Sequence, residues 1–111
     1  FRSPDPACNP YLAFACMLAV GLKGIEGNYP LVEHLERDVY HLTYEEMKDL
    51  GVECLPGSLI EAIEIAENSK ILKETLGEHI FNNLIMSKRI EWDDYRQRVH
   101  EYEITKYLPI L

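Results

Sequence analysis

The sequence predicts a mostly α-helical fold. Two capping boxes of the form Ser/Thr-x-x-Glu, Thr43 with Glu46 and Ser58 with Glu61, each indicate the start of a helix. Apolar residues also recur at helical intervals between about residues 78 and 99. No segment shows the apolar–polar alternation that is typical of a half-buried strand. We therefore expect helices joined by loops, without a sheet.

The first helix is predicted to begin at Asn9 and Pro10, because Asn is a favoured N-cap and Pro suits the first helical position. Residues 11–20 are apolar on every side, and Gly27 is expected to lie past the end of the helix. A helix that is apolar all round is normally buried, and this one is shorter than the roughly 20 residues that span a bilayer. Burying all its faces would use much of the core that 111 residues can provide. We expect it to pack against a part of the protein outside this chain.

The remaining elements follow from breakers and caps. Residues 25–42 are predicted to be irregular, and the helix that begins at Thr43 is expected to stop at Gly51. The helix after Ser58 is interrupted near residue 68, and Ser69 can cap a short helix that Gly77 separates from the longest segment, about 78–99. The tail is expected to form one last amphipathic piece with Tyr102, Ile104, Tyr107 and Leu108.

The charge balance excludes two classes of partner. Lys and Arg total 11 against 19 Asp and Glu, which gives a formal net charge of −8. Nucleic-acid affinity comes largely from clustered cations, so we expect no nucleic-acid-binding surface. The same balance argues against binding to an anionic membrane.

Cysteine usage indicates a reducing compartment. Cys8, Cys16 and Cys54 are odd in number and form no C-x-x-C pair, unlike the even and denser set of a secreted disulfide scaffold. No basic region followed by an apolar stretch opens the sequence, and no initiating Met is present. We therefore expect a cytoplasmic location and a truncated product.

The residues themselves carry little catalytic signal. The four histidines, His34, His41, His79 and His100, lack the spacing that would place two metal ligands on one helix face. No Gly-rich phosphate loop or nucleotide fingerprint appears, and the carboxylates concentrate at helix starts and on charged faces, where capping and solvation account for them. From this chemistry alone, the chain is interpreted as an interaction or scaffold segment.

The order of several motifs gives a more specific hypothesis. Residues 1–12 read F-R-S-P-D-P-A-C-N-P-Y-L, which resembles the glutamine synthetase signature E-x-R-x-P-D-P-x-x-N-P-Y-L. Further segments of that family are resembled, in order, by residues 19–25, 39–43, 55–59, 76–81 and 91–96. The chain is thus identified as resembling type I glutamine synthetases over essentially its whole length.

The resemblance implies that residues 1–111 are the C-terminal helical portion of the catalytic domain, without its β-barrel. It implies an ATP-dependent ligase that joins ammonia to glutamate through γ-glutamyl phosphate, with Mg²⁺ or Mn²⁺. The metal and nucleotide sites would lie mostly upstream of Phe1, so we expect no cofactor-binding or metal residues here and no activity from this segment alone. Two alternatives stay open: a related γ-glutamyl-amine ligase, and a stand-alone helical interaction module.

Three site residues follow from the resemblance. Arg2 matches the Arg of E-x-R, which contacts the substrate glutamate and the developing phosphate charge, a task that suits the planar guanidinium. Tyr40 matches the tyrosine that some type I enzymes adenylylate, although H-L-T follows it in place of D-L-P; a packed loop tyrosine is the alternative. Glu91 resembles a position near the active-site entrance that is linked to glutamine feedback, and the alternative is an ordinary helix-face carboxylate.

The resemblance also implies partners. These are the rest of the catalytic domain and further copies of the parent enzyme, in a dodecamer of two hexameric rings. The apolar tail at residues 107–111 fits a role at the contact between rings, because such a segment would be poorly accommodated in water.

Overall fold

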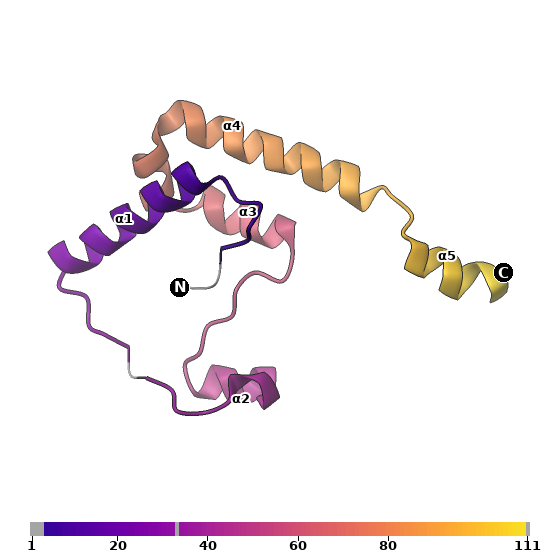
Figure 1. Cartoon of the computed structure of the whole chain (residues 1–111), viewed down its shortest axis with the longest axis horizontal. Helices are drawn as coiled ribbons and strands as arrows, with labels where there is room; N and C mark the ends of the chain where they lie inside the picture. Colours follow the sequence, from indigo (N-terminus) through magenta and orange to yellow (C-terminus); the bar gives the residue numbers. More distant parts are fainter. Residues whose placement is uncertain (1–3, 33, 111) are drawn as a thin grey trace. The chain divides into compact units, whose positions relative to one another are not determined.

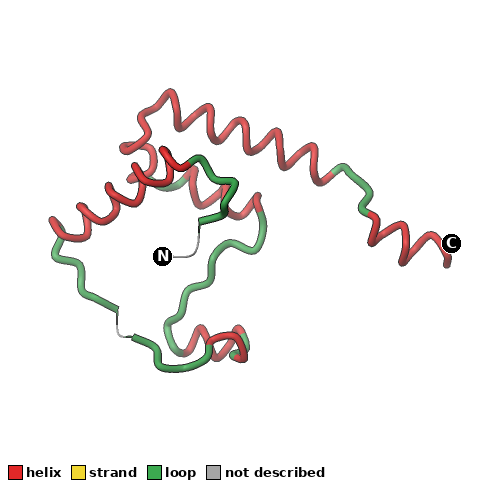
Figure 2. The backbone as a smooth tube through the Cα atoms, viewed as in Figure 1, coloured by secondary structure: helices red, strands yellow, loops and turns green. Residues whose placement is uncertain are grey.

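The chain folds into helices joined by loops. A computed structural model describes residues 4–32 and 34–110. Within these ranges it contains no strand, and the backbone trace in Figure 2 is helix or loop throughout. The elements, labelled in part in Figure 1, are α1 Pro10–Glu26, the 3₁₀ helix η1 Val39–His41, α2 Tyr44–Asp49, α3 Leu59–Glu67, α4 Lys70–Arg96, α5 Glu101–Tyr107 and the 3₁₀ helix η2 Leu108–Ile110. The mostly α-helical prediction is confirmed.

Two compact units divide the chain, Phe1–Gly57 and Ser58–Leu111. The first contains α1, η1 and α2, and the second contains α3, α4, α5 and η2.

Helix α1 begins and ends where its sequence predicts. The Asn9 side chain accepts hydrogen bonds from the backbone N–H groups of Tyr11 and Leu12 at 3.0 and 3.3 Å, and Pro10 occupies the first helical position. At the other end, the N–H of Gly27 donates to the carbonyl of Lys23 at 2.9 Å. These contacts supply partners for groups that a helix end leaves unsatisfied.

Helix α2 is held at its start by a complete capping box. The Glu46 N–H donates to the Thr43 hydroxyl at 3.3 Å, and the Thr43 N–H donates to the Glu46 carboxylate at 2.7 Å. These hydrogen bonds favour the ionised carboxylate, so they lower the pKa of Glu46. Gly51 follows the helix with a φ of +68°, which suits a residue without a Cβ. Both predicted boundaries are therefore confirmed.

One short element lies inside a segment predicted to be irregular. Residues Val39–His41 form a single 3₁₀ turn, η1. The Asp38 carboxylate accepts a hydrogen bond from the Tyr40 N–H at 3.0 Å and caps this turn. An Asp whose side chain bonds to the backbone two residues ahead is a local turn former, and it accounts for this short turn inside the irregular segment.

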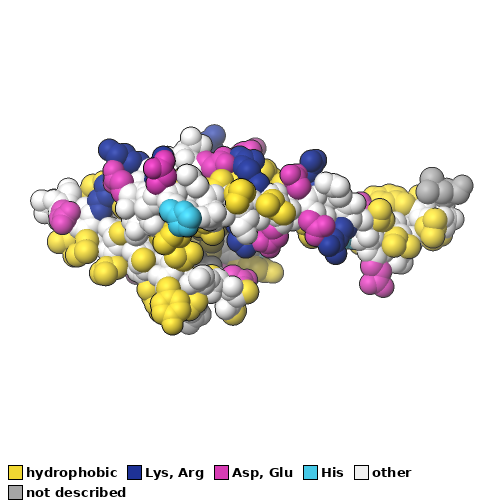
Figure 3. Space-filling view, turned by 90° about the horizontal axis from the view of Figure 1, so that it is seen from above, with side chains coloured by type: hydrophobic (Ala, Val, Ile, Leu, Met, Phe, Trp, Pro, Cys, Tyr) yellow, Lys and Arg dark blue, Asp and Glu magenta, His cyan; other side chains and the backbone are white. Residues whose placement is uncertain are grey.

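No described residue of the first unit is buried. Helix α1 illustrates this, because several of its large apolar side chains are mostly exposed, among them Tyr11, Phe14 and Ile25. The expectation that α1 packs against a part of the protein outside this chain stays a prediction. Apolar side chains also form much of the surface on the face seen in Figure 3, beside charged ones.

The second unit has a small core. Ile63 on α3 and Leu76 and Phe81 on α4 are buried, and α3 and α4 pack against each other. Both helices begin at a serine: the Ser58 hydroxyl accepts from the Glu61 N–H at 3.4 Å, and the Ser69 hydroxyl accepts from the Leu72 N–H at 3.3 Å. These two helix starts are as predicted.

Helix α4 is two helical segments joined at Gly77. This residue has φ +72° and ψ +158°, which is a non-helical conformation inside a 27-residue element. Only glycine adopts this region readily. The predicted separation at Gly77 is confirmed. The predicted last helical piece is also present as α5, where the His100 N–H donates to the Glu103 carboxylate at 2.9 Å.

Candidate functional site

The three predicted site residues fall in different parts of the chain. Arg2 lies outside the described residues. Tyr40 belongs to the first unit and Glu91 to the second. The environments of Tyr40 and Glu91 are local and can be described one at a time.

Tyr40 is presented to solvent on η1. Its side chain is 88% exposed, and its backbone is fixed by the bond to Asp38. The ring meets the His41 ring edge-on, with centroids 5.6 Å apart and planes at 85°. The His41 Nε2 lies 3.6 Å from the other Asp38 carboxylate oxygen. The phenol is exposed on a short 3₁₀ turn, and both alternatives for Tyr40, a modified tyrosine and a packed loop tyrosine, stay predictions.

Glu91 projects from α4 and is held by a neighbour on the same helix. The Lys88 Nζ donates to its Oε2 at 2.6 Å, three positions along the chain. Both side chains are substantially exposed, so the pair is a surface ion pair of small energetic value. This geometry agrees with an ordinary helix-face carboxylate and leaves the feedback role a prediction.

The most specific polar contact in the second unit was not predicted. Arg89 on α4 donates from Nε to Glu67 Oε1 at 2.7 Å and from Nη2 to Glu67 Oε2 at 2.5 Å. This two-pronged bond lowers the pKa of Glu67 and raises the pKa of Arg89. The partners are 22 positions apart, so no local motif in the sequence could have paired them.

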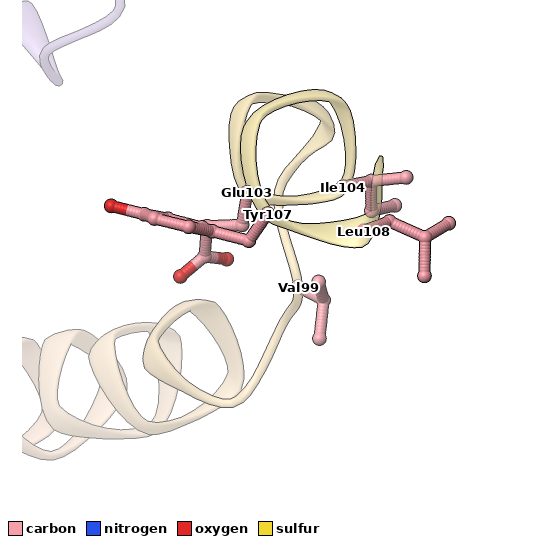
Figure 4. A pocket seen from close by; sticks show the side chains of 5 residues that line it. All are labelled: Val99, Glu103, Ile104, Tyr107 and Leu108. Atoms are coloured by element: carbon pink, nitrogen blue, oxygen red, sulfur yellow. The ribbon is translucent and has the colours of Figure 1, made fainter. Parts of the chain in front are cut away.

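Besides a shallow groove lined by Glu61, Glu64, Ile65 and Asn68, two further shallow apolar grooves lie within the described part of the second unit. One runs beside the Glu67–Arg89 pair and is lined by Glu67, Phe81, Asn82, Ile85, Met86, Arg89, Ile90 and Asp93. The other lies along α5 (Figure 4), where Ile104 and Leu108 project on one side together with Val99, while Glu103 and Tyr107 project to the other. Neither groove gathers the several polar groups that a small polar substrate would need.

The grouping of side chains in the described residues decides whether they could bind a metal ion. Residues 4–32 and 34–110 contain no group of three or more His, Cys, Asp or Glu side chains placed to bind a metal ion. The described carboxylates with the clearest partners serve helix capping and ion pairs, as at Glu46 and Glu67. Across the same residues, no helix combines the length and the apolar character needed to cross a bilayer.

Comparison with known proteins gives one consistent result. Residues 1–107 match the family model described as "Glutamine synthetase, catalytic domain". The chain is 48% identical over 108 residues to the glutamine synthetase of Methanocaldococcus jannaschii. The aligned region covers 97% of this chain and 24% of that protein. It is 49% identical over 109 residues to the glutamine synthetase of Mycolicibacterium smegmatis, and the alignment covers 98% of this chain and 24% of that protein. It is 46% identical over 110 residues to the glutamine synthetase of Methanosarcina mazei, and the alignment covers 99% of this chain and 25% of that protein. The chain thus spans about a quarter of the length of these relatives.

Proposed function

This chain belongs to the glutamine synthetase catalytic-domain family, and we propose that it is the C-terminal helical portion of a longer enzyme that ligates ammonia to glutamate at the expense of ATP. The observation that supports this most directly is the match to the family model over residues 1–107. Its family motifs also occur in their expected order along the whole chain.

In the proposed reaction, the side-chain carboxylate of glutamate takes the terminal phosphoryl group of ATP and ADP leaves. Ammonia then attacks the carbonyl carbon of γ-glutamyl phosphate, and inorganic phosphate leaves as the amide bond forms. We propose that Arg2 is the residue of this chain that contacts the reacting groups. Its guanidinium stays charged and can hold two oxygens of a carboxylate or phosphate at once.

We further propose that ATP and Mg²⁺ or Mn²⁺ are bound by the longer enzyme. Among the described residues, no group of three or more His, Cys, Asp or Glu side chains is placed to bind a metal ion, so the proposed cation site is assigned to the preceding part of the enzyme. When bound, such a cation offsets charge on the transferring phosphoryl group. Residues 1–111 by themselves are accordingly proposed to be inactive.

Two regulatory roles are proposed on the same basis. The exposed Tyr40 phenol is a site of covalent modification in the parent enzyme, and its accessibility on η1 supports this. Glu91 takes part in feedback by glutamine, with Lys88 holding its carboxylate in the absence of the effector. We also propose a cytoplasmic enzyme assembled as two hexameric rings, in which the α5 tail contributes to the contact between rings.

The test is phosphate release from ATP by the complete enzyme that carries this segment, with glutamate and either ammonia or a panel of other amines. Turnover that depends strictly on ammonia is expected. Turnover with a different amine would retain the family and the role of Arg2 but replace the substrate by that amine. Absence of turnover with every amine would favour the helical interaction module instead.

A further inference from the structure

The connection between α4 and α5 lies entirely at the surface. Every residue from 93 to 110 is exposed, so no buried side chain among them fixes the direction in which α5 leaves α4. Figure 1 shows the two helices joined by a short loop, which is residues 97–100. The local contacts of residues 94–103, which we call the α4–α5 joint, therefore determine how firmly the tail is held.

Three contacts hold the joint on its α4 side. The Arg98 N–H donates to the Tyr95 carbonyl at 3.1 Å, and the Arg98 Nη2 donates to Asp94 Oδ2 at 2.6 Å. The His100 ring lies against the Tyr95 ring, with centroids 4.7 Å apart and planes at 41°. Of these three contacts, only the ring contact joins α4 to the residue that caps α5.

His100 also anchors the start of α5 through its backbone. Its N–H donates to the Glu103 carboxylate at 2.9 Å, and its carbonyl accepts from the N–H groups of Glu103 and Ile104 at 3.0 and 3.2 Å. One residue thus begins α5 with its backbone and contacts α4 with its ring. A change in the His100 ring contact therefore acts directly on the direction of α5.

The charge of His100 can alter that contact. Among residues 94–103, histidine is the one residue type that ordinarily changes its charge between pH 5 and 8. Once protonated, the imidazole is a cation within the roughly 6 Å of an aromatic ring centroid at which such a pair attracts. Protonation therefore strengthens the contact with Tyr95.

The charged groups around His100 favour the same form on balance. Glu101 and Glu103, in the first turn of α5, attract a protonated ring and offset the positive end of that helix. Arg98 in the loop opposes protonation, but its guanidinium is paired with the Asp94 carboxylate on α4. Each element of the joint thus leaves the protonated ring stabilised or little affected.

We propose that the α4–α5 joint is a pH-sensitive elbow, in which protonated His100 holds its ring on Tyr95 and fixes the direction of α5, and loss of the proton weakens this hold. The contacts favour the cation when the joint is closed, so the closed joint gains below about pH 6.5 and loses as histidine gives up its proton at higher pH. An exposed cation–aromatic contact changes the ratio of closed to open joints by roughly two- to fivefold.

The elbow acts on a tail that has a role in the proposed function. Ile104 and Leu108 project to one side of α5 together with Val99 (Figure 4), and α5 is the tail proposed to contribute to the contact between rings. A tail held in one direction loses less freedom on docking. The complete enzyme should therefore form its double ring more readily at pH 6 than at pH 8, a consequence that, unlike the elbow itself, rests on the proposed function.

Nuclear magnetic resonance on residues 1–111 measures the elbow directly. Phe14→Asp with Leu18→Asp, in the first unit, is included in every sample to limit association through exposed apolar side chains. Nuclear Overhauser cross-peaks between the Tyr95 and His100 rings should be weaker at pH 7.5 than at pH 5.5. Residual dipolar couplings of α5 should shrink over the same range while those of α4 stay constant. Cross-peaks between Trp92 and Tyr95, whose rings lie 6.1 Å apart within α4, are the internal reference.

Matched variants separate the ring from its charge. His100→Phe keeps an aromatic ring but cannot take up a proton, so its contact with Tyr95 should be equal at both pH values. His79→Phe removes an exposed histidine of α4 outside the joint and should retain the pH response. Tyr95→Leu removes the aromatic partner and should abolish the pH dependence of the α5 couplings, while circular dichroism shows unchanged helix content.

Three results would overturn the elbow. They are equal ring cross-peaks at both pH values, the same pH response in His100→Phe, and a contact that strengthens as the pH rises. Sedimentation velocity of the complete enzyme, with and without His100→Phe, measures assembly separately, and pH-independent assembly beside a responsive elbow removes its role between rings. Phosphate release tests the ligase function by itself, so an active enzyme with an unresponsive joint sinks only the elbow.

Discussion

At the scale of single residues, Glu67 and Arg89 form the polar contact that most directly ties α3 to α4. Their bond is two-pronged, with both guanidinium-to-carboxylate distances at 2.7 Å or less, although each side chain retains contact with solvent. Such a pair orients the two helices more than it stabilises them, since solvent screens exposed charges.

This pair predicts a pH dependence. The hydrogen bonds from Arg89 lower the pKa of Glu67 in the folded chain. Their stabilising effect is fully present above the pKa of a glutamate in the unfolded chain, about 4.3. It is lost as the pH falls through the lower pKa of the folded chain. Glu67→Gln should lower the Tm at pH 7 by no more than a few degrees and have a smaller effect at pH 3. Thermal unfolding followed by circular dichroism measures this. Glu53→Gln, which removes the same charge from an exposed loop, is the control, and an equal effect of Glu67→Gln at both pH values would contradict the assignment.

Arg2 predicts an effect on catalysis in the complete enzyme. If its guanidinium binds the glutamate and phosphate oxygens, Arg2→Ala should reduce kcat by roughly 10²- to 10³-fold, the range found when one transition-state donor is removed. Arg2→Lys should recover only part of this, because an ammonium cannot make the paired contact. Steady-state phosphate release gives both values. Unchanged kinetics in Arg2→Ala would remove this residue from the proposed site.

At the scale of elements, helix starts follow from neighbouring residues. Asn9, Thr43, Ser58 and Ser69 were all recognisable in the sequence because each caps an N–H no more than three positions ahead. The turn η1 was not predicted although Asp38 is an equally local signal, because the breakers Gly27 and Pro30 earlier in the segment favoured an irregular structure.

The backbone conformation of Gly77 leads to a prediction about the stability of α4. Its φ of +72° with ψ of +158° is costly for any residue with a Cβ, even though no atom lies within 4 Å of where a Cβ would be. Gly77→Ala should therefore lower the free energy of unfolding of the second unit by about 1–3 kcal/mol through backbone strain. Urea unfolding measures the change.

Gly24→Ala is the matched control for this substitution. Gly24 lies within the regular helix α1, and a Cβ there also meets nothing within 4 Å. Its replacement should be neutral or stabilise the helix by up to about 1 kcal/mol. A loss of stability at Gly24 as large as that at Gly77 would show that backbone conformation is not the cause.

At the scale of the whole molecule, only three described residues are buried, all of them apolar and all in the second unit. The first unit relies on local capping and turns. A chain of this kind exposes more apolar surface than a self-sufficient domain of the same length.

We therefore predict that residues 1–111 self-associate when no partner is present. Sedimentation velocity should show concentration-dependent species larger than a monomer, and a dye that binds apolar surface should become fluorescent. Phe14→Asp with Leu18→Asp should reduce both signals. A monomer at high concentration without dye binding would contradict this.

The sequence by itself determined the mostly helical class, the main boundaries of six helical pieces and the family, because capping, glycine breaks and motif order depend on neighbouring residues. In the described structure these pieces are α1 to α5, with two of them joined at Gly77 in α4. Only the tertiary structure decided which apolar side chains are buried, that Glu67 pairs with Arg89, and that the large side chains of α1 remain exposed. The physical reason is distance along the chain. A cap is satisfied within one turn, whereas burial and ion pairing between helices depend on which distant segments meet in three dimensions.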